Sequence, residues 1–108
     1  MANTFKNSIT GSIGVSNVIV YTCPAATSTT VIGMSIANVT ANNITISSTL
    51  TSGSSTVYLI KDATVTAGGT TVLVGGDQKV VLTATNYLTV VSSAATSADV
   101  VVSVLEIS

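Results

Sequence analysis

Short runs of Val, Ile and Thr, separated by Gly, Asn and Ser, make up most of this 108-residue sequence. β-branched side chains suit a pleated, half-buried surface and are only moderate helix formers. Apolar and polar side chains alternate within the runs, and residues that favour turns lie between them. The pattern predicts an all-β sandwich or barrel of about eight short strands, at residues 17–23, 30–39, 43–50, 56–61, 70–74, 78–83, 87–92 and 99–107.

The opening segment is less regular and is rich in Asn, Ser, Thr and Gly. We expect an extended N-terminal arm over residues 1–15, followed by one β-sandwich domain over residues 16–108. Phe5 and Ile9 are the large apolar side chains of this arm, which makes them candidate anchors on a partner. The alternatives are that the segment adds another strand or frays as a free terminus.

Charged residues make up only 6% of the chain, against about a quarter in a typical soluble domain, and His and Arg are absent. General acid–base chemistry therefore lacks its usual groups, so we expect no catalytic residue and no enzyme. Three scattered lysines do not form the basic surface that nucleic acids need. No apolar run reaches the roughly 18 residues of a membrane-spanning helix, so we expect neither nucleic acid nor membrane as a partner.

One cysteine, Cys23, excludes an internal disulfide. Without a His beside it, Cys23 is expected to be a small buried apolar residue and not a nucleophile. The composition excludes a His and Cys metal site. Calcium binding by Asp62, Asp77 or Asp99 is a minor alternative, because these acids are isolated and lack the spacing of a calcium loop. We therefore expect no metal and no cofactor.

Two of the predicted strands carry apolar residues on both faces. Val57 and Leu59 alternate with Tyr58 and Ile60, and valines occupy both phases of residues 100–107. A strand that is buried on both faces is unusual in a two-layer sandwich. We therefore expect one face to pack into the core and the other against a neighbouring subunit, in an assembly that we expect to be a homotrimer.

The chain has three tyrosines, Tyr21, Tyr58 and Tyr87. An aromatic ring that carries a hydroxyl suits stacking on a sugar, but strand packing with the hydroxyl in solvent is the commoner role. Tyr58 and Tyr87 join Phe5 and Ile9 as the predicted partner-binding residues.

Several segments combine residue choices that β-propensity alone does not require. The sequence reads Val-Tyr-Leu-Ile-Lys-Asp-Ala over residues 57–63, Gly-Gly-Thr over 68–70, Val-Gly-Gly-Asp-Gln-Lys-Val-Val-Leu over 74–82, and Asp-Val-Val-Val-Ser-Val-Leu-Glu-Ile-Ser over 99–108. Together with residues 20–24 and 36–38, this sequence resembles a family of small virion structural proteins of tailed phages, common in marine and cyanobacterial phages. The resemblance extends from about residue 18 onward. It implies a small jelly-roll-like β-sandwich of about eight antiparallel strands with an extended N-terminal arm.

The function that this resemblance implies is structural. We expect a capsid decoration, or cement, protein that binds the major capsid protein and stabilises its shell. The alternatives are a neck or tail structural protein, or a receptor- or polysaccharide-binding adhesin of the phage particle. The N-terminus lacks the apolar segment of a secretory signal, so we expect synthesis in the host cytoplasm and assembly there into the virion.

Overall fold

The computed structural model of the chain describes residues 3–75 and 79–108, and these residues form nine β-strands and no helix. None of the described segments is therefore a helix that could cross a membrane. The strands are β1 (Asn3–Ile13), β2 (Val18–Thr22), β3 (Ser28–Asn38), β4 (Ile44–Ser52), β5 (Ser55–Val65), β6 (Thr70–Val74), β7 (Val80–Leu82), β8 (Tyr87–Ser92) and β9 (Ala98–Ile107).

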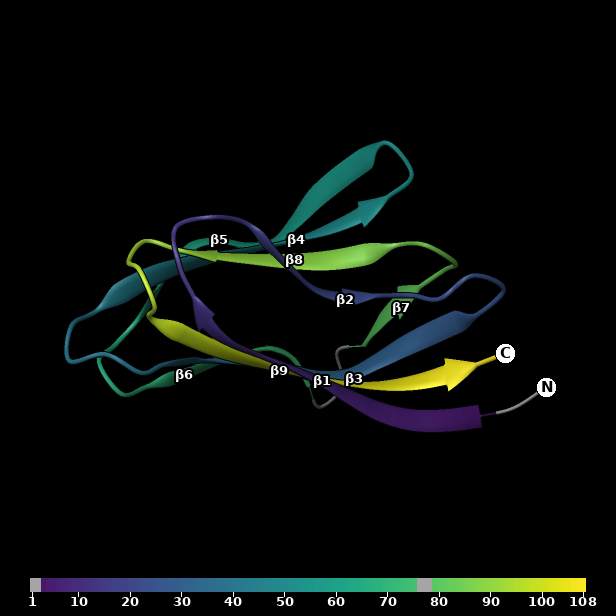
Figure 1. Cartoon of the computed structure of the whole chain (residues 1–108), viewed down its shortest axis with the longest axis horizontal. Coiled ribbons are helices and arrows are strands. Elements are labelled where there is room, and N and C mark those ends of the chain that lie inside the picture. The colour runs from purple at the N-terminus through teal and green to yellow at the C-terminus, as the bar shows by residue number, and fades with distance from the viewer. Residues whose placement is uncertain (1–2, 76–78) are drawn as a thin grey trace.

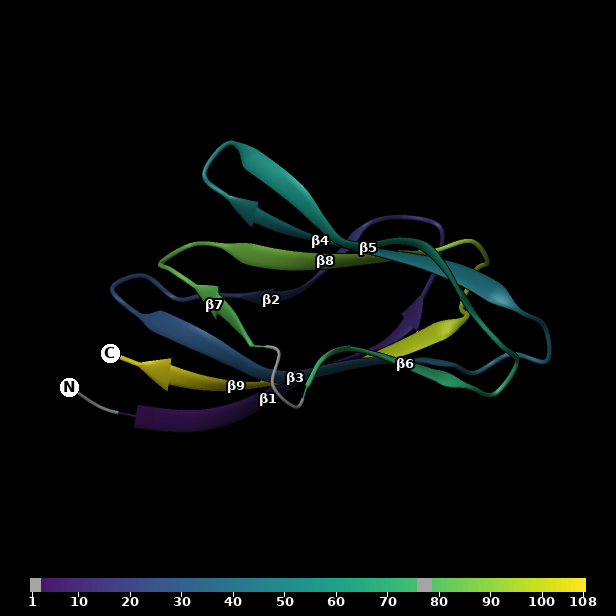
Figure 2. The ribbon, with the colours of Figure 1, turned by 180° about the vertical axis from the view of Figure 1, so that it is seen from behind.

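The strands form two antiparallel sheets that pack face to face (Figure 1). Sheet A has the order β1-β9-β3-β6, and sheet B has the order β2-β8-β4-β5. β6 and β7 pair with different halves of β3, as the rear view shows (Figure 2). These two strand orders are those of a jelly roll, to which β7 is a short addition. The predicted all-β, jelly-roll-like sandwich is thereby confirmed.

Each of the eight predicted runs forms a strand, and the bounds of β6 and β8 agree with the prediction to the residue. The ninth strand, β1, comes from the segment that was expected to extend as an arm. Its residues Asn3–Thr10 pair with β9 in unbroken register. The structure thus places this segment within sheet A, as an edge strand, because its backbone hydrogen-bonding groups find partners along β9.

β5 departs from the prediction that both of its faces are covered. It is an edge strand of sheet B, and Val57 and Tyr58 are both more than half exposed. Its register with β4 shifts twice, so β5 carries extra residues that β4 does not match. One irregularity lies opposite Ser47, where Asp62 adopts a φ of +49° and its N–H donates to Ser47 Oγ at 2.9 Å. An edge strand has only one neighbour, and bulges turn it further away from the sheet.

Aliphatic side chains fill the space between the sheets. Burial of each contributes about 1.5–3 kcal/mol, more than a surface ion pair does, so this core dominates the stability of the fold. Cys23 is only 1% exposed, which confirms that it is a buried apolar residue. The core comprises Ile13, Val20, Cys23, Val31, Met34, Ile36, Ile44, Ile46, Val65, Val74, Leu82, Leu88, Val90, Ala98, Val100, Val102 and Val104.

Asn38, the last residue of β3, ties together loops that lie far apart in the sequence. Its buried Nδ2 donates to the carbonyl oxygens of Asn42 (2.7 Å), Val65 (3.0 Å) and Thr66 (3.2 Å). Its Oδ1 accepts hydrogen bonds from the N–H and the hydroxyl of Thr40. One amide therefore satisfies the polar groups that the ends of β3 and β5 leave inside the protein.

We expect Asn38→Ala to lower the free energy of unfolding by about 1–3 kcal/mol, because it removes the hydrogen bonds of a buried amide, including the buried one to the Val65 carbonyl oxygen. Urea denaturation measures the loss. Asn17→Ala, at an exposed position, is the matched control and should be almost neutral. Equal losses in the two variants would contradict the role assigned to Asn38.

Candidate functional site

The outer face of sheet A carries large apolar side chains that no described residue covers. Phe5 is 75% exposed and Ile9 74%, and Val72, Val81 and Val101 are exposed as well. These residues come from β1, β6, β7 and β9, so the face extends across the whole sheet. Single exposed apolar residues are common on protein surfaces, but several large ones gather on this one sheet face, which makes it the candidate site.

The pairing register arranges this face in rows. Residues that lie directly opposite one another in antiparallel strands have their side chains on the same face. Asn7, Ser103 and Gly33 form a polar middle row. One row lies on each side of this middle row, and both begin and end with apolar residues. They are Phe5-Leu105-Thr30-Val81 and Ile9-Val101-Ser35-Val72.

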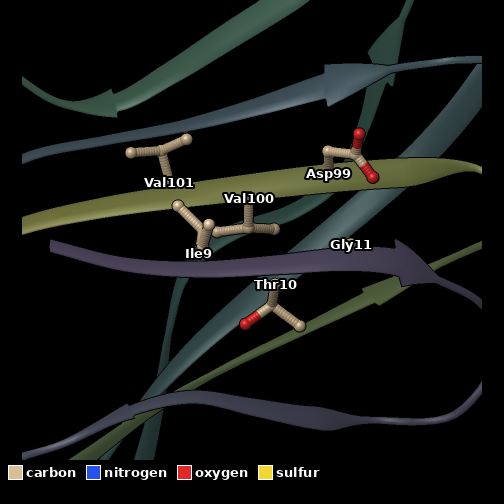
Figure 3. A pocket seen from close by; sticks show the side chains of 6 residues that line it. All are labelled: Ile9, Thr10, Gly11, Asp99, Val100 and Val101. Carbon is tan, nitrogen blue, oxygen red and sulfur yellow. The ribbon is translucent and has the colours of Figure 1, made fainter.

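Two shallow grooves lie along β1 and β9 on this face, with volumes of about 390 and 400 Å³. Figure 3 shows the first groove, where Ile9 of β1 and Val101 of β9 lie close together. The second groove is lined by Phe5, Ile32 and Ser103, among others. Each groove thus has a large apolar side chain of β1 beside it.

A bulge ends the regular part of β1, and Asp99 of β9 holds it. The register shifts between Thr10 and Ile13, and Ser12 adopts a φ of +57°. The N–H of Ser12 donates to Asp99 Oδ1 at 3.1 Å. A Cβ on Gly11 would approach the same oxygen to 3.3 Å, so a residue without a side chain suits this position. Asp99 is the only charged side chain among the described strand residues of this face.

The outer face of sheet B is rich in hydroxyl groups. The hydroxyls of Thr49 and Thr89 are hydrogen-bonded to each other across β4 and β8. Thr51 is bonded in the same way to Thr56 of β5 at 2.9 Å. Thr51 and Thr89 are themselves buried, so these hydroxyls find their partners along the sheet and not in water.

The four predicted partner-binding residues are divided between the two faces. Phe5 and Ile9 lie together on the outer face of sheet A. Tyr58 lies opposite Thr49, and Tyr87 lies opposite Thr51, so both belong to the outer face of sheet B.

Ile32, Val72 and Val81 also lie on the outer face of sheet A, although the sequence did not mark them as site residues. Val81 alternates regularly with Val80 and Leu82 in β7, but Ile32 and Val72 lie at register shifts of β3 and β6 that side-chain alternation does not reveal. Without the strand order, alternation also did not show that they share a face with Phe5 and Ile9. The second apolar face of β9, with Val101 and Leu105, was correctly anticipated.

Tyr21 does not reach solvent as expected, because its side chain is turned into the sandwich. The Tyr21 hydroxyl donates to Glu106 Oε2 at 2.5 Å and lies 2.9 Å from Thr29 Oγ1. Glu106 is 8% exposed, and its Oε1 forms an ion pair with Lys6 Nζ at 2.9 Å. This network joins β1 and β9 of sheet A to β2 of sheet B. A sugar-binding surface made of all three tyrosines is therefore wrong.

The network shifts the pKa values of two of its members. Burial, reinforced by the hydrogen bond to Glu106, raises the pKa of Tyr21 from 10.0 to about 12. The hydrogen bonds from Tyr21 and from Lys6 hold the pKa of Glu106 below its ordinary value of 4.5. Both shifts favour one state, in which Glu106 is ionised and Tyr21 is protonated.

The remaining candidate groups for chemistry lie apart. Asp62 belongs to sheet B and Asp99 to sheet A, while Asp77 lies outside the described residues. Cys23 Sγ is 3.2 Å from both Thr29 Oγ1 and the carbonyl oxygen of Thr27. Within residues 3–75 and 79–108, no three His, Cys, Asp or Glu side chains are placed to hold a metal ion. The described part of the chain offers apolar side chains on the outer face of sheet A as its contact surface.

Comparison with solved structures finds this fold in a virus particle. A chain of the T13 particle of infectious bursal disease virus (IBDV) matches 96% of the present chain with a TM-score of 0.59 at 12% sequence identity. A chain in the structure of the Gx strain matches 96% with a TM-score of 0.52, also at 12% identity. The present chain covers 30% and 36% of these two chains, about a third of their length. Neither a protein-family model nor a curated protein sequence matches it.

We expect the protein to lose stability in alkali between pH 10 and about 12. The folded state raises the pKa of Tyr21, so its contribution is complete below pH 10 and disappears as the pH rises through 12. Tyr21→Phe should lower the free energy of unfolding at pH 7 by about 1–3 kcal/mol and flatten this alkaline decline. Urea denaturation across the pH range measures both effects, with the exposed Tyr58→Phe as the control. A decline that persists unchanged in Tyr21→Phe would contradict the assignment.

In acid, Glu106 should dominate the corresponding loss. Because its folded-state pKa is lowered, its contribution is complete above about pH 4.5 and is lost as the pH falls through the folded-state value. Glu106→Gln should therefore be less stable than the parent at pH 7 but should lose less stability on acidification. Urea midpoints of both proteins, measured from pH 7 downward, test this. If the two proteins lost the same stability on acidification, another group would be responsible.

Proposed function

We propose that this protein is a structural component of a virus particle, specifically a capsid decoration protein of a tailed phage. It attaches through the outer face of sheet A to the shell that the major capsid protein forms. It carries no catalytic group and no cofactor in this role, and its place is on the virion.

The fold supports the general part of this proposal. The jelly-roll topology and the likeness to chains of infectious bursal disease virus both point to a virion structural role. The sequence resemblance to small virion proteins of tailed phages supports the narrower assignment to a phage.

The exposed apolar side chains on the outer face of sheet A carry the proposal. Phe5, Ile9, Val72 and Val81 are each more than 60% exposed. Apolar burial contributes about 25 cal/mol per Å², whereas an exposed ion pair contributes only about 0–1 kcal/mol. With Asp99 as its one charged strand residue, this face binds best to a partner surface that is itself apolar and neutral. An oligomer that contacts the shell at several points strengthens a modest contact through multivalency.

A second candidate function rests on the other sheet. Tyr58 is exposed on the hydroxyl-rich outer face of sheet B, and Lys61 Nζ lies 5.2 Å from the centre of its ring. An exposed aromatic ring among hydroxyl groups suits a sugar, as in a polysaccharide-binding adhesin. Loss of glycan binding in Tyr58→Ala, with shell attachment retained, would favour this alternative.

We expect binding to particles of the virus that encodes this chain to change little, or to strengthen, between about 0.1 and 1 M salt. The screening length falls from about 10 to about 3 Å over this range, which weakens charge pairs but not apolar contact. Co-sedimentation with particles that lack the chain measures the bound fraction. Steep release by salt would contradict attachment through this face.

Val72→Asp should abolish this binding, because it places a charge in the apolar row that contains Ile9 and Val101. Ile19→Asp is the matched control, since Ile19 is 56% exposed and lies opposite Thr89 on the outer face of sheet B. The number of copies per purified particle identifies the role: a decoration protein is present in many copies, and a tip protein in a few. Equal losses in the two variants, or only a few copies, would overturn the decoration assignment.

A further inference from the structure

β1 has a long free edge that is regular enough to accept another strand. Asn3–Thr10 pair with β9 without a break, and no described strand pairs with the opposite side of β1. The other edges of the two sheets are less suitable. β6 and β7 have only five and three residues, and the registers of β2 and β5 are irregular. A regular, unpaired edge strand is a template for pairing with another chain.

The sequence of β1 nearly reads the same in both directions around Asn7. Residues 4–10 are Thr-Phe-Lys-Asn-Ser-Ile-Thr, so Thr4 matches Thr10 and Phe5 matches Ile9. In an antiparallel pair of two such strands centred on Asn7, each apolar residue lies opposite an apolar residue. Each polar residue likewise lies opposite a polar one. Such self-complementarity is what an isologous two-fold contact requires.

Lys6 is the charged residue of this edge strand, and it forms an ion pair within its own chain. A lysine on an edge strand blocks pairing because its charge must stay in water. Here Lys6 Nζ is 2.9 Å from Glu106 Oε1 of its own chain. In the centred register Lys6 lies opposite Ser8 of the partner subunit, so no two like charges face each other.

We propose that two copies of this chain associate through antiparallel pairing of their β1 strands, about a two-fold axis at Asn7. The two A sheets then become one continuous sheet. Phe5 packs against Ile9 of the partner subunit, next to the groove lined by Phe5 and Ile32, and the Asn7 side chains meet at the axis. The edge that this sequence and register offer supports a two-fold pair, which differs from the homotrimer expected from the sequence.

The pairing uses the edge of sheet A and leaves its outer face free. The two outer faces join side by side, which doubles the apolar surface available to a shell. This association is a property of the isolated chain and does not depend on the proposed function. Its test therefore succeeds or fails separately from particle binding.

Cysteine cross-linking tests the register. Residues directly opposite in an antiparallel pair have Cα atoms about 4.5–5.5 Å apart, within the range of a disulfide. Asn7→Cys should therefore form a covalent dimer under mild oxidation. In Asn3→Cys the two cysteines would lie eight residues apart along the paired strands, about 27 Å, and should not cross-link. The native Cys23 is 1% exposed and does not interfere. Equal cross-linking of the two variants would overturn the register.

Sedimentation equilibrium tests the association itself. The parent protein should have twice the 10.8 kDa mass of one chain at micromolar concentrations. Phe5→Asp should weaken the dimer by about tenfold or more, because the dimer then loses both Phe5–Ile9 contacts and places two carboxylates beside apolar Ile9 side chains. Val72→Asp, on the far edge of the same sheet, should remain dimeric although it loses particle binding. A monomeric parent, or equal dissociation of the two variants, would overturn the proposal.

Discussion

Sheet A depends on β9, which pairs along its length with β1 on one side and β3 on the other. Valine occupies both phases of this strand, but the interior of a two-layer sandwich accepts only one. Val100, Val102 and Val104 fill the core, so Val101 and Leu105 must lie on the outer face. The apolar outer face is therefore a direct result of the composition of β9. Neighbouring strands extend it by placing Phe5 and Ile9 in the same rows.

The polar groups inside the sandwich determine how the strands are aligned. An aliphatic interior tolerates a slip of two residues, because such a slip keeps every side chain on its own face. Glu106 lies opposite Thr29 at the start of β3, and Asn38 lies at its end. Each needs partners from other strands or loops, which only one alignment supplies. These two polar positions hold the register that the valines alone leave open.

Local pattern was enough to predict the strands, the buried Cys23 and the two-sided β9, because these depend on side-chain alternation and turn residues. It was not enough for features that depend on distant pairing. β1 and β9 lie at opposite ends of the sequence, so the opening segment read as an arm. The inward turn of Tyr21 follows from the register shift between Ile19 and Tyr21, which places Tyr21 opposite the buried Leu88. Simple alternation cannot show such a shift. The shared face of Phe5 and Val72 likewise required the strand order.

The bulged β5 has a consequence for how far chains of this kind can associate. A sheet protein with two unguarded edges can add copies at both and grow into a fibre. In sheet B, the register of β5 with β4 shifts twice, so β5 offers no straight run of backbone hydrogen-bonding groups to a strand of another chain. β2, at the other side of the same sheet, is short and irregular as well. Sheet B therefore offers no regular edge to an added strand, which confines growth by strand pairing to sheet A in a chain this rich in Val, Ile and Thr.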